Sequence, residues 1–512
     1  MKKRTSSGWV ILAIVLITGI PYLVAYLSAG SEMVFGGFLL NPIDGSSYLA
    51  KMYQGWEGSW KFTLPYTAQP GDGGYLFLFY LFLGQLARWF GISLGLTFHI
   101  ARILGSIALG LALFRFFQSI FPDDRDQKRA YFLAFIGSGS GWLAFLFGQM
   151  PADFWVAEAF PILSSYANPH FPFSLALILT ILTIQPARLL ERKTIWVALA
   201  SLALSTLLPF GVVVSLVVLC GTGLWTYLEE RRLEWVKPVT VAAAGAPMMI
   251  YQLALTLQDP VIAGWNAQNL TPSPALWDLI VATSPAFLLA LIGLKPALQR
   301  NDRATRMLLV WAVGGMILLY VPFSLQRRFM LGFYIPLAAL AIIGLNELVK
   351  DKARWSRLGF AGLVILSVPT TMVVLLAGFS GMIMRDPMIY LTRGEAQALT
   401  WVQQNTPGDA LIIAGPETGL LIPAYSGRRV IYGHPYETVD AKTREGEVDE
   451  FFADGWSRSR GEYLQDERID YVWVGPREKT LGSVAVPGEY PVVYQANDVT
   501  IYQVAANDGS GS

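Results

Sequence analysis

The sequence predicts a polytopic α-helical membrane protein with about eleven transmembrane helices, an interfacial helix and a C-terminal extracytoplasmic α/β domain. Composition gives the class: 54% of the 512 residues are hydrophobic, only 15% are charged, and the mean hydropathy is +0.44. Soluble domains carry about a quarter charged residues. The second observation is an alternation, because Arg and Lys gather in every second gap between the apolar segments, as they do in cytoplasmic loops.

A transmembrane helix needs about 20 mostly apolar residues. The first candidate follows Lys2, Lys3 and Arg4 and is longer than the apolar core of a cleaved signal peptide. We therefore expect a retained anchor with a cytoplasmic N-terminus. In chain order, the candidate segments are residues 9–27, 94–120, 131–147, 171–190, 194–208, 210–227, 239–257, 276–294, 307–323, 329–348 and 358–376.

A further apolar run, residues 75–86, determines the side of every later loop. If this run crosses the membrane, the later basic clusters lie outside, against the positive-inside tendency. If it lies flat in the outer interface, they lie inside, and its aromatic residues suit that depth. We therefore expect an interfacial helix. The clusters are Arg125, Lys128 and Arg129; Arg188, Arg192 and Lys193; Arg231, Arg232 and Lys237; Lys295, Arg300, Arg303 and Arg306; and Lys350, Lys352, Arg354 and Arg357.

The chain divides into a transmembrane domain, residues 1–380, and an extracytoplasmic α/β domain, residues 390–505, with a disordered tail at 506–512. Periodicity in the second domain predicts helices and short strands. The helices are expected at 395–404 and 448–453, and the strands at 410–414, 430–432, 471–474, 492–494 and 499–502, the last two as a hairpin around Asn497 and Asp498.

Charge and cysteine content exclude several classes of protein. The net charge of +1 has no basic stripe of the kind that binds nucleic acid. Cys220 is the single cysteine and lies in an apolar segment, so one chain cannot form a disulfide framework. Three histidines are too few and too dispersed for a zinc cluster.

The first outer loop, residues 31–74, is long enough to suggest a function and contains a polar string from Asn41 to Tyr48. Asp44 in this string follows the first span, where a carboxylate could act as a general base. It could equally cap a helix that begins near Gly45, and the two roles are compatible. Tyr48 is a candidate contact for an acceptor substrate.

The second outer loop, residues 148–170, contains Asp153, Glu158 and His170. Either acid could share a divalent cation with Asp44, because hard cations prefer oxygen ligands. No cofactor is otherwise expected. The alternative is that the two acids only solvate the loop.

Arg327 and Arg328 occupy a short outer gap between two spans, against the positive-inside bias. The guanidinium fork matches phosphate oxygens, so a lipid phosphate at the membrane surface is a natural partner. Snorkelling to bulk lipid phosphates is the alternative. Three further polar residues, His434, Glu437 and Asp440, follow a predicted strand and are interpreted as a solvated turn.

This arrangement resembles the GT-C class of polytopic glycosyltransferases, which includes protein O-mannosyltransferases, oligosaccharyltransferases and aminoarabinose transferases. By this resemblance, Asp44 matches the acidic residue of the first loop, and Arg327 and Arg328 suit the phosphate of a polyprenyl-linked donor. Gly45 departs from members with paired acids in that loop. Either Asp153 or Glu158 would correspond to the acid of the second loop.

The resemblance implies an inverting enzyme of the cell membrane that transfers a hexosyl or pentosyl group from a polyprenyl phosphate or diphosphate. The acceptor would be a glycan, lipid or protein on the outer face, and no nucleic acid is involved. Two rival hypotheses are a flippase for lipid-linked sugars, with Arg102 and Arg115 inside a span, and a non-catalytic envelope protein whose outer domain binds a partner.

Overall fold

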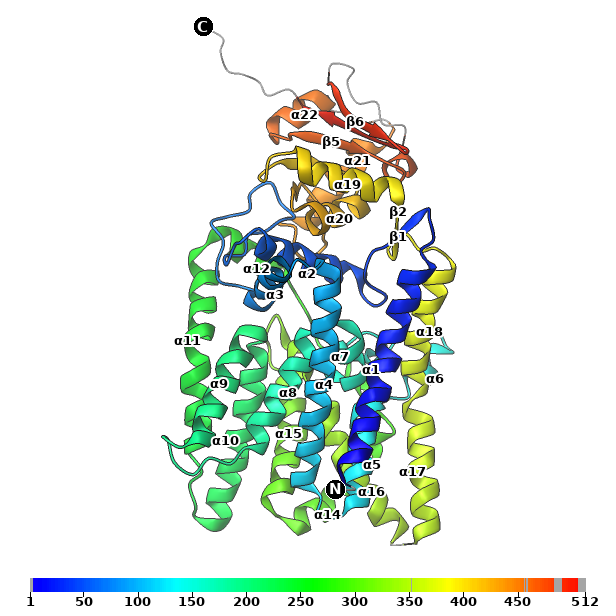
Figure 1. The fold of residues 1–512 in the computed structure, drawn as a ribbon. Coiled ribbons are helices and arrows are strands. Elements are labelled where there is room, and N and C mark those ends of the chain that lie inside the picture. The colour runs from blue at the N-terminus through cyan, green and yellow to red at the C-terminus, as the bar shows by residue number, and fades with distance from the viewer. Residues whose placement is uncertain (1–2, 351, 455, 457–458, 483–489, 505–512) are drawn as a thin grey trace. The chain divides into compact units, whose positions relative to one another are not determined.

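The computed structural model describes residues 3–350, 352–454, 456, 459–482 and 490–504. The chain forms two compact units, which are described separately (Figure 1). The helical unit comprises Met1–Pro21, His99–Tyr251 and Leu270–Ser380, and the mixed unit comprises Tyr22–Phe98, Gln252–Asn269 and Gly381–Ser512. The predicted tail at 506–512 lies outside the described residues.

The helical unit is built from apolar helices joined by short connections. Four helices have residues in both units: α1 (Lys3–Ser28), α4 (Leu94–Ile120), α11 (Val236–Gln258) and α18 (Pro369–Ile383). The others are α5 (Asp124–Ile136), α6 (Gly141–Phe145), α7 (Pro161–Ala167), α8 (His170–Thr183), α9 (Arg192–Leu207), α10 (Phe210–Glu230), α13 (Leu276–Thr283), α14 (Ala286–Arg300), α15 (Arg303–Leu319), α16 (Tyr334–Val349) and α17 (Ala353–Ser367), with short 3-10 turns η1 (Ala152–Phe154), η2 (Ala157–Ala159) and η3 (Gln326–Met330).

Five helical stretches among the described residues are long and apolar enough to cross a membrane, or six if the bent pair α13 and α14 forms one span. The predicted number of about eleven is not confirmed. The span expected at 131–147 is interrupted by a Gly and Ser run at 137–140, and the span expected at 276–294 bends by 86° where Ser284 and Pro285 separate the two helices. Gly favours helix ends, and Pro lacks the amide that a continuing helix needs.

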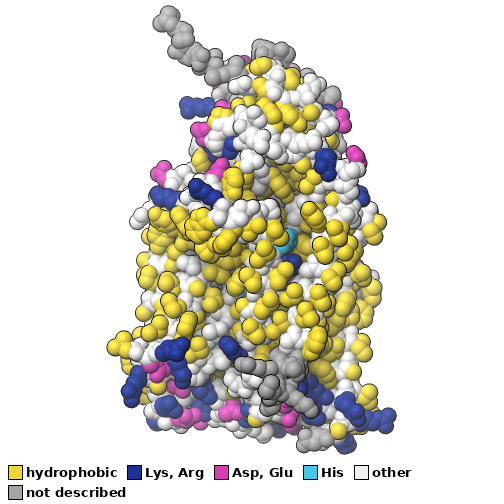
Figure 2. Space-filling model, in the orientation of Figure 1, with side chains coloured by type: hydrophobic (Ala, Val, Ile, Leu, Met, Phe, Trp, Pro, Cys, Tyr) yellow, Lys and Arg dark blue, Asp and Glu magenta, His cyan; other side chains and the backbone are white. Residues whose placement is uncertain are grey.

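Two glycines let the backbones of α14 and α16 touch. A Cβ on Gly344 would lie 1.9 Å from the carbonyl oxygen of Leu289, and one on Gly293 would lie 2.3 Å from that of Leu340. Small residues at such crossings are typical of membrane helix packing. Lys and Arg side chains gather at the end of the helical unit where α10 and α14 end and α15 and α17 begin (Figure 2).

The first outer loop folds within the mixed unit. It forms strand β1 (Met33–Phe35) and helix α2 (Pro42–Trp56), and the same unit contains α3 (Leu78–Phe90) and α12 (Pro260–Gln268). Strand β1 pairs antiparallel with β2 (Tyr390–Thr392). Helix α3 covers most of the run predicted to be interfacial, and its depth in the membrane stays a prediction.

Close packing of α2 against α3 again depends on glycine. A Cβ on Gly55 would lie 2.1 Å from the carbonyl oxygen of Leu81, and one on Gly84 would lie 1.9 Å from that of Met52. The backbones of the two helices therefore lie in direct contact.

The C-terminal part of the mixed unit contains a five-stranded sheet in the order β4-β3-β5-β7-β6, as the α/β prediction requires. Strand β3 pairs parallel with β4 and β5, and β7 pairs antiparallel with β5 and β6. The elements are α19 (Arg393–Asn405), β3 (Leu411–Ile413), α20 (Pro416–Ser426), β4 (Arg429–Val430), α21 (Ala441–Phe452), α22 (Arg460–Asp466), β5 (Tyr471–Val474), η4 (Glu478–Thr480), β6 (Val492–Ala496) and β7 (Val499–Gln503).

The predicted hairpin between β6 and β7 is confirmed. Its two turn residues, Asn497 and Asp498, have φ values of 49° and 66°, which suit a tight turn between twisted strands. Helix α20, which contains Pro423, has no counterpart in the sequence prediction.

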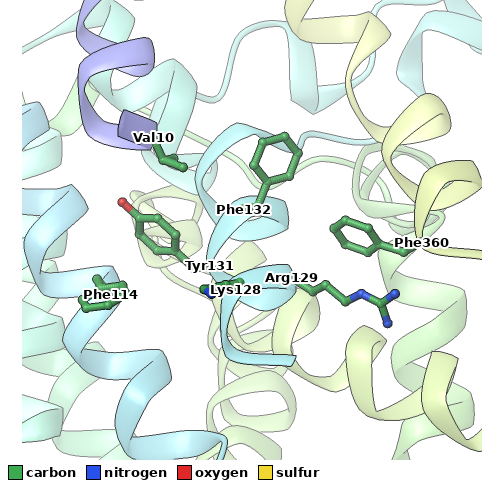
Figure 3. A pocket seen from close by; sticks show the side chains of 7 residues that line it. All are labelled: Val10, Phe114, Lys128, Arg129, Tyr131, Phe132 and Phe360. Atoms are coloured by element: carbon green, nitrogen blue, oxygen red, sulfur yellow. The ribbon is translucent and has the colours of Figure 1, made fainter. Parts of the chain in front are cut away.

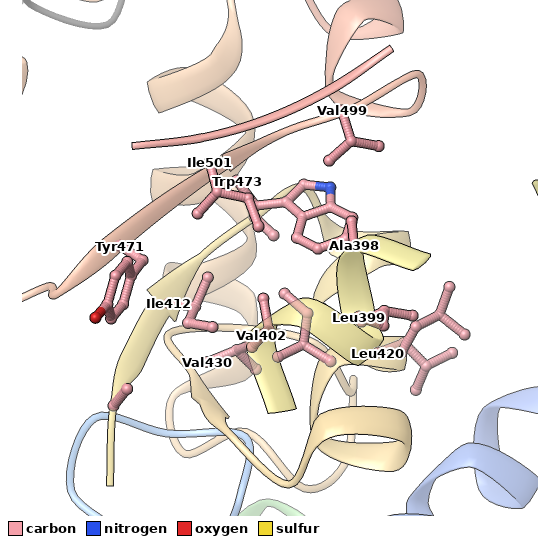
Figure 4. Close-up of a cluster of buried hydrophobic side chains, with 14 of the residues drawn as sticks. Ala398, Leu399, Val402, Ile412, Leu420, Val430, Tyr471, Trp473, Val499 and Ile501 are labelled. Carbon is pink, nitrogen blue, oxygen red and sulfur yellow. The ribbon is translucent and has the colours of Figure 1, made fainter. Parts of the chain in front are cut away.

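Alternate side chains of β5 enter two different cores. Tyr471 and Trp473 pack on the face with α19 and α20 (Figure 4), and Val472 and Val474 pack on the face with α21 and α22. This follows from the two-residue repeat of a strand. Ala50 and Tyr66 of the first loop also join the α19 face, so the loop shares a core with the C-terminal sheet.

Candidate functional site

Asp44 lies in the first turn of α2 and is partly exposed, with 37% of its side chain accessible. The helix begins at Pro42 and its cap is Asn41, whose Oδ1 accepts the N–H of Asp44 at 3.4 Å. The expectation that Asp44 caps a helix starting near Gly45 is therefore wrong. Nδ2 of Asn41 donates to Oδ2 of Asp44 at 2.5 Å, which fixes one carboxylate oxygen and leaves Oδ1 on the other side.

His434 is beside Asp44, with Nε2 3.8 Å from Oδ1. The backbone N–H groups of Tyr436 and Glu437 both donate to Nδ1 of His434, each at 3.1 Å. Because Nδ1 is an acceptor, the neutral ring carries its hydrogen on Nε2. Burial lowers the pKa of His434 below its ordinary value, against the attraction of Glu437 and Asp44, so the neutral form is favoured.

A buried ion pair lies on the same face of α2. Nζ of Lys51 is 2.6 Å from Oε1 of Glu437, and Oγ of Ser47 donates to the same oxygen at 2.6 Å. Burial alone would raise the pKa of Glu437, but the charge of Lys51 and the hydrogen bonds from Lys51 and Ser47 hold it below its ordinary value. Aromatic rings surround the ammonium group, with ring centroids 5.4 Å away for Tyr48, 5.3 Å for Phe62 and 4.5 Å for Phe77.

No pattern in the sequence predicted this cluster, and the expectation for its C-terminal part was a solvated turn. That interpretation is wrong for His434 and Glu437, which are 1% and 8% exposed, although Asp440 is exposed. A helical repeat could have indicated Lys51, because positions 44, 47, 48 and 51 lie on one face of a helix. The partners of this face, His434 and Glu437, could not be predicted in this way, because they are about 390 residues away in the sequence.

Tyr48 packs against helix α3, and Gly45 packs against an earlier residue of the first loop. The ring of Tyr48 stacks on that of Tyr80 with centroids 4.3 Å apart. A Cβ on Gly45 would lie 2.3 Å from Cγ of the buried Phe38. There is no space for a second acid after Asp44, which explains the departure from a paired acidic motif.

In the helical unit, Glu158 meets both predicted phosphate-binding arginines. Its Oε1 lies 3.8 Å from Nε of Arg327 and 3.7 Å from Nη1 of Arg328. The indole of Trp155 packs 5.0 Å from the Arg327 guanidinium. Glu158 is 4% exposed, whereas the arginine side chains retain 23% and 26% exposure. The trio therefore has a net charge of +1 and an accessible cationic edge.

Backbone contacts hold the arginine segment. The N–H of Thr271 donates to the carbonyl of Ser324 at 2.9 Å, and that of Arg327 donates to the carbonyl of Thr271 at 3.1 Å. The N–H of Gly332 donates to the carbonyl of Glu158 at 2.9 Å. The guanidinium groups are thus attached to a fixed backbone.

Within the described part of the chain, the hydrogen bonds of Asp153 are to residues other than Glu158, Arg327 and Arg328. Its Oδ2 accepts the N–H groups of Gly139 and Gly141 at 3.2 and 3.1 Å. It is fully buried, and burial raises its pKa from 3.8 to about 7. The expectation that Asp153 and Glu158 solvate a loop is therefore wrong. His170 is also buried, at the start of α8, with its ring 4.0 Å from that of Phe171.

The settings of the two second-loop acids do not suit a cation. Glu158 faces two positive charges, and backbone amides already occupy Oδ2 of Asp153. Across the described ranges, no three His, Cys, Asp or Glu side chains are grouped as metal ligands. We therefore derive no step through a metal.

A groove of about 250 Å³ in the helical unit contains none of the predicted site residues (Figure 3). Its basic residues already have partners: Lys128 pairs with Asp124 at 2.6 Å, and Arg129 donates to Oγ of Ser356 at 2.7 Å. The lining residues are Val10, Phe114, Lys128, Arg129, Tyr131, Phe132 and Phe360.

Comparison with solved structures identifies the fold. The oligosaccharyltransferase of Archaeoglobus fulgidus, in its apo form, superposes with a TM-score of 0.53 at 14% identity over 92% of this chain and 69% of that one. The fold is the GT-C fold. The same enzyme tethered to an acceptor peptide with an NVT sequon gives 0.53 at 13% identity over 91% of this chain and 69% of that one.

ArnT from Cupriavidus metallidurans bound to undecaprenyl phosphate gives a TM-score of 0.45 at 13% identity over 98% of this chain and 99% of that one. No protein-family model matches the sequence, and no curated protein matches it. The assignment of the GT-C fold rests on the oligosaccharyltransferase, and identity this low carries the fold alone.

Proposed function

We propose that the protein is a membrane glycosyltransferase that transfers a hexosyl or pentosyl group from a polyprenyl phosphate or diphosphate to an acceptor on the outer face of the cell membrane. The observation that carries this proposal is the setting of the Asp44 carboxylate. In a chain with the GT-C fold, it offers an accessible carboxylate oxygen beside a neutral histidine.

Asp44 acts as the general base in the proposed reaction. It takes the proton of the acceptor hydroxyl as the acceptor oxygen bonds to the anomeric carbon. The bond from that carbon to the phosphate oxygen breaks, and the lipid phosphate leaves with the electron pair. Attack opposite the leaving group inverts the configuration. Tyr48, four residues from Asp44 on the same helix face, contacts the acceptor.

Arg327 and Arg328 bind the donor phosphate and stabilise its developing charge. The contacts with Glu158 and the partial exposure of both arginine side chains support this role, since the buried carboxylate orients guanidinium groups that a phosphate can still reach. Packing of Trp155 on Arg327 further restricts that side chain.

The proposed topology follows from the loop charges. The N-terminus is cytoplasmic, the C-terminal sheet is extracytoplasmic, and α3 lies in the outer interface. A lipid-carried donor explains why the sequence has no glycine fingerprint for a nucleotide.

The flippase hypothesis depended on arginines within a span. Nη1 of Arg102 donates to the backbone carbonyls of Thr18 and Ser165, both at 2.9 Å, so this side chain has a structural role. Arg115 is exposed on α4. Neither observation favours transport.

Turnover by the purified protein in lipid nanodiscs tests the proposal. Polyprenyl-phosphate-linked hexoses and pentoses are offered with lipid, glycan and peptide acceptors, and the released polyprenyl phosphate is measured. Asp44→Asn should abolish release, whereas Asp72→Asn, an exposed carboxylate in the same loop, should not. Full activity of D44N would remove Asp44 from the mechanism, and an inactive wild type would refute the proposed class.

A further inference from the structure

We propose that His434 is a positioning residue for Asp44, supplied by the C-terminal part of the chain, and that its Nε2–H holds Oδ1 of the base during transfer. The inference rests on the proposed role of Asp44. It gives the turn after β4, in the C-terminal part of the chain, a role in forming the site.

The ring orientation is fixed from the Nδ1 side. Two backbone N–H groups, from Tyr436 and Glu437, donate to Nδ1, so a flipped ring would lose both bonds. The ring also packs 5.6 Å from that of Tyr66. Among the described residues, Nε2 is buried without a hydrogen-bond partner, and Oδ1 of Asp44 lies 3.8 Å from it.

The turn that carries His434 is anchored to α2 by the Lys51–Glu437 ion pair, three residues further along. Helix α12 holds the other side of the turn. Nε1 of Trp265 donates to the carbonyl of Tyr436 at 2.9 Å, and the N–H of Asp440 donates to Oε1 of Gln268 at 3.0 Å. Contacts with α2 on one side and with α12 on the other therefore fix the position of the turn that carries His434.

The two oxygens of Asp44 would then have separate donors. Asn41 already donates to Oδ2, and a closer approach of about 1 Å would bring Oδ1 within hydrogen-bond distance of Nε2–H. Two donors fix the plane of the carboxylate, as outer-shell partners do for other reactive groups. Because the ring is neutral, it orients the base without forming an ion pair that would quench it.

Two substitutions separate this role from a purely structural one. In His434→Asn, Oδ1 can replace Nδ1 as acceptor for the two backbone N–H groups, but nothing replaces Nε2–H. In His434→Gln, Nε2 can replace the donor towards Asp44. Tyr436→Phe is the matched control, because it alters an exposed ring in the same turn and keeps its backbone bonds.

The kinetic test compares kcat and KM in nanodiscs. H434N should unfold at the wild-type temperature, lower kcat about 10- to 100-fold and leave the donor KM within about threefold, while H434Q should recover most of kcat. Y436F should match wild type. Unchanged kcat in H434N, or equal loss of kcat in H434N and H434Q, would overturn the proposal.

A second measurement keeps the contact testable even if H434N does not fold or no donor turns over. With three histidines in the chain, ¹⁵N-histidine labelling resolves each ring. The Nε2–H tautomer of His434 and a shift of its Nε2 resonance in D44N are expected. An Nδ1–H tautomer, or an Nε2 resonance that D44N does not move, contradicts the inference. A shifted resonance together with full activity of D44N would leave the contact between His434 and Asp44 standing but refute Asp44 as the base, and with it the role of His434 in transfer.

Discussion

Nζ of Lys51 lies 2.6 Å from Oε1 of Glu437, although 386 residues separate them in the sequence. Their side chains are 0% and 11% exposed. The pair joins helix α2 of the first loop to the turn after β4. It places the polar residues of both segments in one buried network within the mixed unit.

Lys51→Met should destabilise the mixed unit strongly. Removing one partner of a buried ion pair leaves the other charge uncompensated and typically costs about 3–5 kcal/mol. The apparent unfolding temperature in detergent should fall, and adding Glu437→Gln should recover part of the loss. Lys61→Met, an exposed lysine of the same loop, is the control. If K51M and K61M have the same apparent unfolding temperature, the ion pair does not stabilise the fold.

Arg328→Gln should weaken donor binding. A hydrogen bond to a charged group contributes about 1.5–3 kcal/mol, so the donor KM should rise by about 10- to 100-fold. Arg303→Gln, which breaks an arginine pair with Glu234 elsewhere in the helical unit, is the matched control. Glu158→Gln should lower kcat, because both guanidinium groups lose the carboxylate that helps to orient them. Equal donor KM values in R328Q and R303Q would contradict phosphate binding.

Asp153→Asn should change how stability depends on pH. Burial raises the pKa of Asp153 from 3.8 to about 7, so the folded protein binds this proton more tightly than the unfolded chain. The contribution to stability is complete below about pH 4 and is lost as the pH rises through 7. Between pH 5 and about 8, the unfolding temperature of the wild type should therefore fall relative to that of D153N. Parallel pH curves for the two proteins would exclude a raised pKa.

Gly45→Ala should destabilise the first loop. Its Cβ would lie 2.3 Å from Cγ of Phe38, whose ring packs edge-on against Phe98 at 5.2 Å. Overpacking of this kind costs about 1–3 kcal/mol. Gly95→Ala is the comparison, because nothing lies within 4 Å of a Cβ there. Equal unfolding temperatures for the two variants would show that Phe38 can move aside.

Much of the architecture could be predicted from patterns between neighbouring residues. Composition indicates the membrane class, and the two-residue repeat of 471–474 and the turn residues Asn497 and Asp498 predict the C-terminal sheet. The number of spans was harder to predict, because the apolar residues on both sides of the Gly and Ser run at 137–140 keep the average hydropathy of 131–147 as high as that of a continuous helix. A hydropathy average does not register a break of four residues.

The sequence by itself determined a membrane protein of many apolar helices, a reactive-looking carboxylate at Asp44 and a cationic pair at Arg327 and Arg328. Only the tertiary structure decided what stands beside them, namely His434 beside the carboxylate and Glu158 beside the arginines. Periodicity and charge bias act over a few turns of chain, whereas these neighbours are brought together by packing between segments more than a hundred residues apart. No local pattern records that packing.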